Sequence, residues 1–90
     1  MSFNDLQEKA IDIEIDLLKK RDWLKIEHRE ITSDPPMIFL RINFGDSSFK
    51  SSDVSWLKRI AKKYNCRVKF LAFHNKDHLS VDLYFYPKEV

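Results

Sequence analysis

The stretch RVKFLAFHNKDHLSVDLYFYP, Arg67 to Pro87, decides the fold of this chain. Its second half alternates as a strand does, with one face of the extended chain formed by Leu79, Val81, Leu83 and Phe85. Its first half is a similar apolar run, and residues 75–77 (Asn-Lys-Asp) between the two are turn formers. The stretch therefore predicts a β-hairpin.

Two helices and a second hairpin are predicted before this stretch. Ser2 caps a helix that runs through residues 6–21, with an apolar stripe at helical spacing formed by Leu6, Ala10, Ile13 and Leu17. Strands are predicted at Trp23 to Ile31 and Met37 to Phe44, because the two prolines of the turn at 32–36 cannot lie inside a central strand. Ser51 or Ser52 caps the second helix, whose inward residues are Val54, Leu57, Ile60, Ala61 and Tyr64.

This order predicts a single compact domain over residues 1–90 of the α+β class. We expect a two-layer sandwich in αββαββ order, with a four-stranded antiparallel sheet and two helices on one face. Its two halves, residues 2–45 and 51–88, read as an αββ pseudo-repeat, although any two helix–hairpin units resemble each other at this level. The inward strand residues are expected to be Leu24, Ile26, Ile38, Leu40, Ile42, Phe44, Val68, Phe70, Ala72, Leu79, Val81, Leu83 and Phe85.

Composition narrows the class of protein. The 90 residues carry a net charge of only +2, which gives no global case for nucleic-acid binding. The single cysteine, Cys66, excludes an internal disulfide and suits a reducing compartment. No apolar run approaches bilayer length, and the N-terminus lacks the features of a secretion signal. We therefore expect a cytoplasmic protein without a membrane partner.

The alternation also predicts an unusual second face of the sheet, turned away from the helices. It carries Trp23, Lys25, Met37, Phe39, Arg41, Arg67, Lys69, Leu71, Phe73, Tyr84 and Tyr86. An exposed apolar and aromatic mixture of this size is larger than a soluble monomer usually shows, so something should cover it.

Three explanations compete for this face. Aromatic and apolar residues beside arginine are typical of a protein interface, and the candidate partner-binding residues are Phe39, Arg41, Lys69, Leu71, Phe73, Tyr84 and Tyr86. The same rings could stack unpaired bases. A different strand register, or a first helix on this side, would instead bury the face within the monomer. We place protein contact first, because the net charge is small and no glycine-bearing RNA-binding motif occurs.

Two further surfaces are candidates. The alternative function, nucleic-acid binding, would use the basic second helix together with the sheet face, through Lys58, Arg59, Lys62, Lys63 and Arg67. A solvated helix surface explains the same charges. The first helix has a second apolar stripe, which predicts self-association into a homodimer, formed by Ile11, Ile15 and Leu18.

The candidate catalytic and metal-binding residues are the histidines and the single cysteine. His74 and His78 flank the hairpin turn, and with Cys66 or His28 they could in principle bind zinc, but CxxC and HExxH spacings are absent. We therefore favour titratable loop histidines over a zinc site. Cys66 begins a strand whose even positions point inward, so we expect a buried, inert thiol. We expect no cofactor, no metal and no enzymatic activity.

These observations predict a small protein that acts by stoichiometric binding. We expect an inhibitor or adaptor that occludes a site on a larger protein or nucleoprotein. Accessory proteins of phages and mobile elements that block host defence nucleases, anti-CRISPR proteins among them, are one class that fits such a domain, although no motif singles them out.

Overall fold

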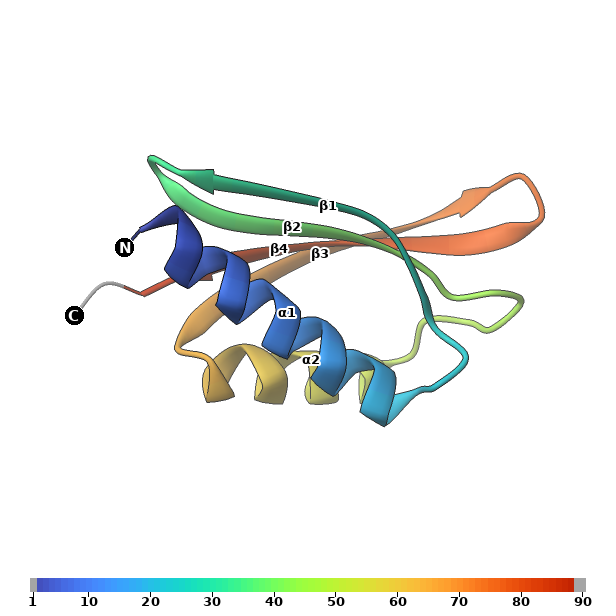
Figure 1. The fold of residues 1–90 in the computed structure, drawn as a ribbon. Coiled ribbons are helices and arrows are strands. Elements are labelled where there is room, and N and C mark those ends of the chain that lie inside the picture. Colours follow the sequence, from blue (N-terminus) through green and yellow to red (C-terminus); the bar gives the residue numbers. More distant parts are fainter. Residues whose placement is uncertain (1, 89–90) are drawn as a thin grey trace.

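The structure, a computed structural model, describes residues 2–88 and has the predicted element order (Figure 1). The α+β class and the four-stranded antiparallel sheet are confirmed. Figure 1 shows both helices on the same side of this sheet. The elements are α1 (Phe3–Lys20), β1 (Lys25–Ser33), β2 (Pro36–Asn43), α2 (Ser51–Lys63), β3 (Cys66–Asn75) and β4 (His78–Pro87).

Helix α1 begins and packs as its sequence predicts. The Ser2 hydroxyl accepts a hydrogen bond from the Asp5 backbone N–H at 3.2 Å, which satisfies one of the unpaired N–H groups of the first turn. The predicted inward stripe is fully buried: Leu6, Ala10, Ile13 and Leu17. Neither described helix combines the length and the apolar character needed to cross a membrane.

Helix α2 is capped differently from the prediction. Its N-cap is Lys50, not Ser51 or Ser52, and the Lys50 backbone N–H donates to Asp53 Oδ2 at 2.9 Å. The carboxylate of Asp53 is buried and also accepts from Trp56 Nε1 at 2.8 Å. An acidic residue in the first turn is stabilised by the helix dipole, so Asp53 replaces the serine cap.

The sheet has the order β1-β2-β4-β3, so the second strand of each hairpin lies at its centre. Strands β2 and β4 pair through Leu40 with Leu83 and through Ile42 with Val81. Exchange of the two halves of the chain leaves this order unchanged, which is the symmetry that an αββ repeat predicts. The repeat itself stays a prediction.

Strand β1 departs from simple alternation. Its pairing with β2 is irregular after Ile26, where Glu27 forms a β-bulge. Beyond the bulge the odd-numbered residues lie on the helix side, and Arg29 and Ile31 pair with the buried strand residues Leu40 and Ile38.

Most of the predicted inward residues form the core. One inward residue and one residue of the second face were predicted wrongly. Ala72 is exposed although its partner Val81 is fully buried, because β3 is an edge strand of the sheet and β4 is not. Trp23 does not lie on the second face: it sits in the turn between α1 and β1, edge-on to the core ring of Phe44 at 5.7 Å. The strand begins two residues later than predicted, so alternation does not govern Trp23.

Candidate functional site

The surface of the sheet turned away from the helices, hereafter the open face, is built by alternate residues of β2, β3 and β4. Pairing places Phe39 beside Tyr84, and Arg41 beside Asp82. On the other side of β4, Leu71 pairs with Asp82 and Phe73 with Ser80. The open face thus brings together the predicted partner-binding residues Phe39, Arg41, Lys69, Leu71, Phe73, Tyr84 and Tyr86.

An ion pair occupies the centre of the open face. Arg41 donates from Nε and from a terminal nitrogen to the two carboxylate oxygens of Asp82, at 2.8 and 2.9 Å. The Asp82 side chain is only 5% exposed, whereas that of Arg41 is 41% exposed. The carboxylate therefore neutralises Arg41 from below, and two parallel bonds fix the plane of the guanidinium.

Aromatic rings surround this ion pair. The Arg41 guanidinium lies over Phe39 at 5.8 Å and over Phe73 at 5.6 Å. The rings of Phe39 and Tyr84 are 5.0 Å apart. Cation–π and ring–ring contacts of this kind each contribute about 0.5–1.5 kcal/mol. The rings of Phe39, Phe73 and Tyr84 are each half-buried, and neither described helix lies on this side of the sheet (Figure 1).

The outer part of the open face belongs to β3. Leu71 is 58% exposed, the largest exposed fraction among the exposed large hydrophobic side chains of the described residues. Lys69 lies over the ring of Tyr86 at 5.9 Å. A hollow of about 410 Å³ is lined there by Arg67, Val68, Lys69 and Tyr86. The centre of the open face is thus an ion pair between aromatic rings, and two exposed cations, Arg67 and Lys69, lie at its β3 margin.

The basic residues of α2 lie on a different surface. Helix α2 is on the far side of the sheet from the open face, so Lys58, Arg59 and Lys62 do not join the aromatic residues (Figure 1). Lys63 is bound to Asp16 of α1 at 2.8 Å. The basic helix and the aromatic sheet face are thus two separate surfaces, and nucleic-acid binding by either stays a prediction.

The same contact between the helices shifts a pKa. Asp16 accepts hydrogen bonds from Lys63 Nζ at 2.8 Å and from the Tyr64 hydroxyl at 2.7 Å. These bonds favour the ionised carboxylate, so they hold the pKa of Asp16 below its usual value. The pair thus links α1 to α2.

The histidines and the cysteine are dispersed. Among residues 2–88, no three His, Cys, Asp or Glu side chains are grouped as a metal site requires. Cys66 is buried beneath the sheet edge, and burial raises the pKa of its thiol. His28 lies at the margin of the open face, with its ring 6.0 Å from that of Phe39.

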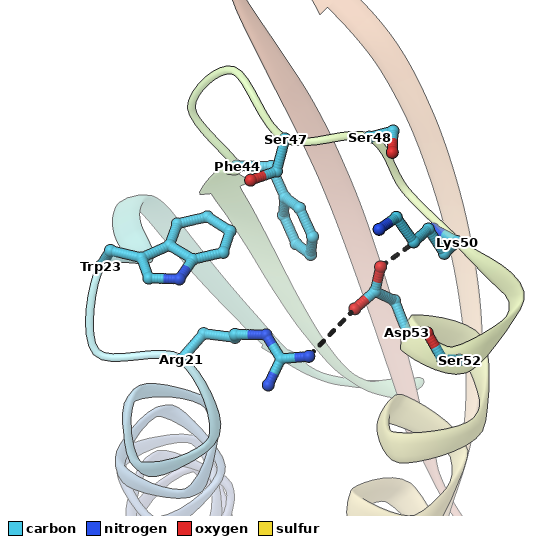
Figure 2. A pocket seen from close by; sticks show the side chains of 8 residues that line it. All are labelled: Arg21, Trp23, Phe44, Ser47, Ser48, Lys50, Ser52 and Asp53. Carbon is cyan, nitrogen blue, oxygen red and sulfur yellow. Dashed lines mark hydrogen bonds and ion pairs between the residues drawn. The ribbon is translucent and has the colours of Figure 1, made fainter.

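A pocket that the sequence did not reveal lies where α1 ends and α2 begins (Figure 2). It has a volume of about 380 Å³ and is lined by Arg21, Trp23, Phe44, Ser47, Ser48, Lys50, Ser52 and Asp53. Arg21 approaches Asp53 within 4.0 Å, while Asp53 also bonds to Lys50 and Trp56. A carboxylate with these partners ties the two helix ends together. The spacing of Asp53 and Trp56, three residues apart on one helix, is the only sequence signal for this arrangement.

No known protein family, curated protein or solved structure matches the chain.

Proposed function

We propose that the chain is a non-enzymatic protein-binding domain whose open face contacts one site on a larger protein or nucleoprotein. Bound there in a fixed ratio, it acts as an inhibitor or adaptor. The observation that carries this proposal is the ion pair of Arg41 and Asp82 set between Phe39 and Phe73. The centre of the open face is therefore aromatic and close to electrically neutral, and its side chains are fixed before a partner binds.

Order before binding favours affinity. Side chains that are fixed by their neighbours lose little further rotamer freedom in a complex, which saves about 0.5–1.5 kcal/mol for each. Aromatic rings beside an arginine are also the composition of binding hot spots. Leu71, exposed next to this cluster, supplies apolar area that a partner can bury.

The ion pair argues against nucleic acid on the open face. A phosphate that approached Arg41 would meet a guanidinium already bonded to both oxygens of Asp82. It would also meet the Asp82 charge directly below. The second candidate, nucleic-acid binding, would instead use the outer surface of α2, where Lys58, Arg59 and Lys62 are exposed, or the exposed Arg67 at the β3 margin.

We infer one class of partner that this proposal would suit. Stoichiometric blockers of defence nucleases, such as the anti-CRISPR proteins of phages and mobile elements, are one class that such a domain would suit. The proposal includes a cytoplasmic partner, because a single, unpaired cysteine suits a reducing compartment.

Affinity capture with matched baits tests the proposal. Leu71→Glu places a charge on the open face at an exposed position, and Phe3→Glu places the same charge at an exposed position on α1. We expect proteins retained by the wild type and by Phe3→Glu to be lost with Leu71→Glu. Phe73→Ala with Tyr84→Ala should lose the same proteins.

Charge reversal on α2 separates the two candidate functions. Lys58→Glu with Lys62→Glu should leave protein capture unchanged. If the chain instead binds a single-stranded oligonucleotide with a steep salt dependence that these two substitutions abolish, the second candidate replaces the first. A protein partner that the Leu71→Glu bait retains fully would refute the open face as the contact surface.

A further inference from the structure

A second interaction surface lies at the free edge of β1. The sheet order leaves β1 and β3 at the edges, and α1 packs against β1 and β2. Lys9 and Asp16 of α1 bond to the end of α2, so they mark the flank of α1 that faces α2. At 3.6 residues per turn, Ile11 and Leu18 lie about 140–180° around the helix from these two residues, on the flank above the free β1 edge. Ile15 lies about 100–120° from them, between that flank and the side of α1 opposite the core, and the three residues form one exposed stripe.

We propose that two copies of the chain pair through their β1 edges, antiparallel and about a twofold axis, with the stripes of the two α1 helices packed against each other. A strand added at the usual spacing of about 4.8 Å continues the sheet. Because α1 lies over β1 and β2, the second α1 then arrives beside the first at about 8–10 Å, the ordinary distance of packed helices. One contact therefore covers both the unpaired backbone groups of β1 and the apolar stripe.

The contact between Glu14 and Arg29 fixes where the axis passes. Arg29 Nε lies 3.4 Å from Glu14 Oε2, so this point of β1 lies beside this point of α1. The stripe from Ile11 to Leu18 is centred on residues 14 and 15. An axis through Arg29 therefore also passes through the centre of the stripe, so Ile11 of one copy meets Leu18 of the other.

The charges of β1 agree with this register. Residues opposite each other in an antiparallel pair share a face, and an axis at Arg29 sets His28 opposite Glu30 of the second copy. An axis at Glu30 would set two carboxylates against each other; the axis at Arg29 sets two guanidinium groups opposite each other, but each is paired at 3.4 Å with Glu14 of its own chain. Glu14 Oε2 is buried and accepts no hydrogen bond from the described residues, although it lies next to the axis. Arg29 of the second copy would bring a donor to this oxygen.

The other edge is protected against the same pairing. Strand β3 carries Arg67 and Lys69, and the flank of α2 beside it carries Lys58 and Lys62. Two copies joined at β3 would bring these like charges together, which is a common device against edge pairing. We therefore place the contact at β1, because the helix beside it, α1, carries an apolar stripe, whereas β3 and α2 carry cations.

Sedimentation equilibrium over a concentration series tests the proposal. We expect the wild type to form dimers, and Ile11→Asp with Ile15→Asp to raise the dissociation constant at least about 100-fold. Leu71→Asp, a charge at an exposed position on the open face, should leave it unchanged. A wild type that stays monomeric, or a dimer that only Leu71→Asp disrupts, would overturn the proposal.

A crosslink tests the register independently of the helix variants. Arg29→Cys should form a disulfide-linked dimer under mild oxidation, because self-opposed residues have Cα atoms about 4.5–5.5 Å apart. Lys25→Cys, in the same strand, should not, since its copies would lie more than about 20 Å apart. The reverse result would overturn the register. Cys66 is buried and stays in both variants.

Discussion

The ion pair at the centre of the open face predicts an unequal response to two substitutions. Arg41→Met leaves the Asp82 carboxylate, 5% exposed, without its partner, whereas Asp82→Asn leaves a guanidinium that is 41% exposed. A buried charge that loses its partner costs about 3–5 kcal/mol. In Asp82→Asn the half-exposed guanidinium of Arg41 can hydrogen-bond to water instead. Loss of the ion pair then costs only about 1 kcal/mol. We expect Arg41→Met to destabilise the fold by about 3 kcal/mol and Asp82→Asn by about 1 kcal/mol.

Urea denaturation followed by circular dichroism measures both values. For a domain of this size each kcal/mol corresponds to about 4–8 °C in melting temperature, so Arg41→Met should melt at least about 10 °C below the wild type. Arg67→Met is the matched control, because Arg67 is exposed on the same face and forms no ion pair with a described residue. It should change the free energy of unfolding by less than about 0.5 kcal/mol.

The double variant Arg41→Met with Asp82→Asn completes the cycle. Removing both charges should cost less than Arg41→Met alone, because no buried carboxylate remains. Equal costs for the two single variants would refute the reasoning. So would an Arg41→Met variant as stable as the Arg67→Met control, since Asp82 would then not be a buried charge held by Arg41.

Three further predictions concern stability. Asp53→Ala should cost about 2–3 kcal/mol in thermal melts, because it removes the acceptor of the Lys50 backbone N–H and leaves the buried Trp56 indole N–H without a partner. Ser80→Ala should leave the free energy of unfolding unchanged or raise it by up to about 1 kcal/mol, because the Ser80 hydroxyl is buried and has no hydrogen-bond partner among the described residues. The pKa of Asp16 is lowered in the folded state, so its contribution is present above its unfolded value of 3.8 and is lost as pH falls through the folded value. Asp16→Asn should therefore be less stable than the wild type at neutral pH, and the difference measured by urea denaturation should vanish in strong acid.

Alternation and helical spacing were sufficient to predict the fold class. In β2 and β4 every second residue is aliphatic or Phe, and these residues are the buried centre of the sheet. The one-sided stripe of α1 and the Ser2 cap were equally direct, because both depend on local spacing alone. The turn residues before β4 fixed the hairpin, with Lys76 in the left-handed region at φ +59°.

Long-range pairing explains what the sequence could not predict. The bulge at Glu27 involves no glycine or proline, and it arises only when β1 is matched against β2. The burial of Asp82 depends on Arg41, which lies 41 residues away in the chain. The pocket beside Trp23 depends on the meeting of two helix ends (Figure 2). The sequence predicted most of the residues that form the open face. The neutral ion pair at its centre could not be predicted without the strand order.

The two proposed surfaces make one joint prediction. A twofold axis perpendicular to the sheet would place both open faces on the same side of one eight-stranded sheet, so a dimer would present two binding sites in one direction. Ile11→Asp with Ile15→Asp should then leave the affinity for a single partner unchanged. On a surface densely coated with that partner, this variant should dissociate at least about 100-fold faster than the wild type, because it loses avidity. On a sparse surface the two rates should agree. Equal dissociation rates on the dense surface would contradict this arrangement of the open faces, even for a chain that forms dimers.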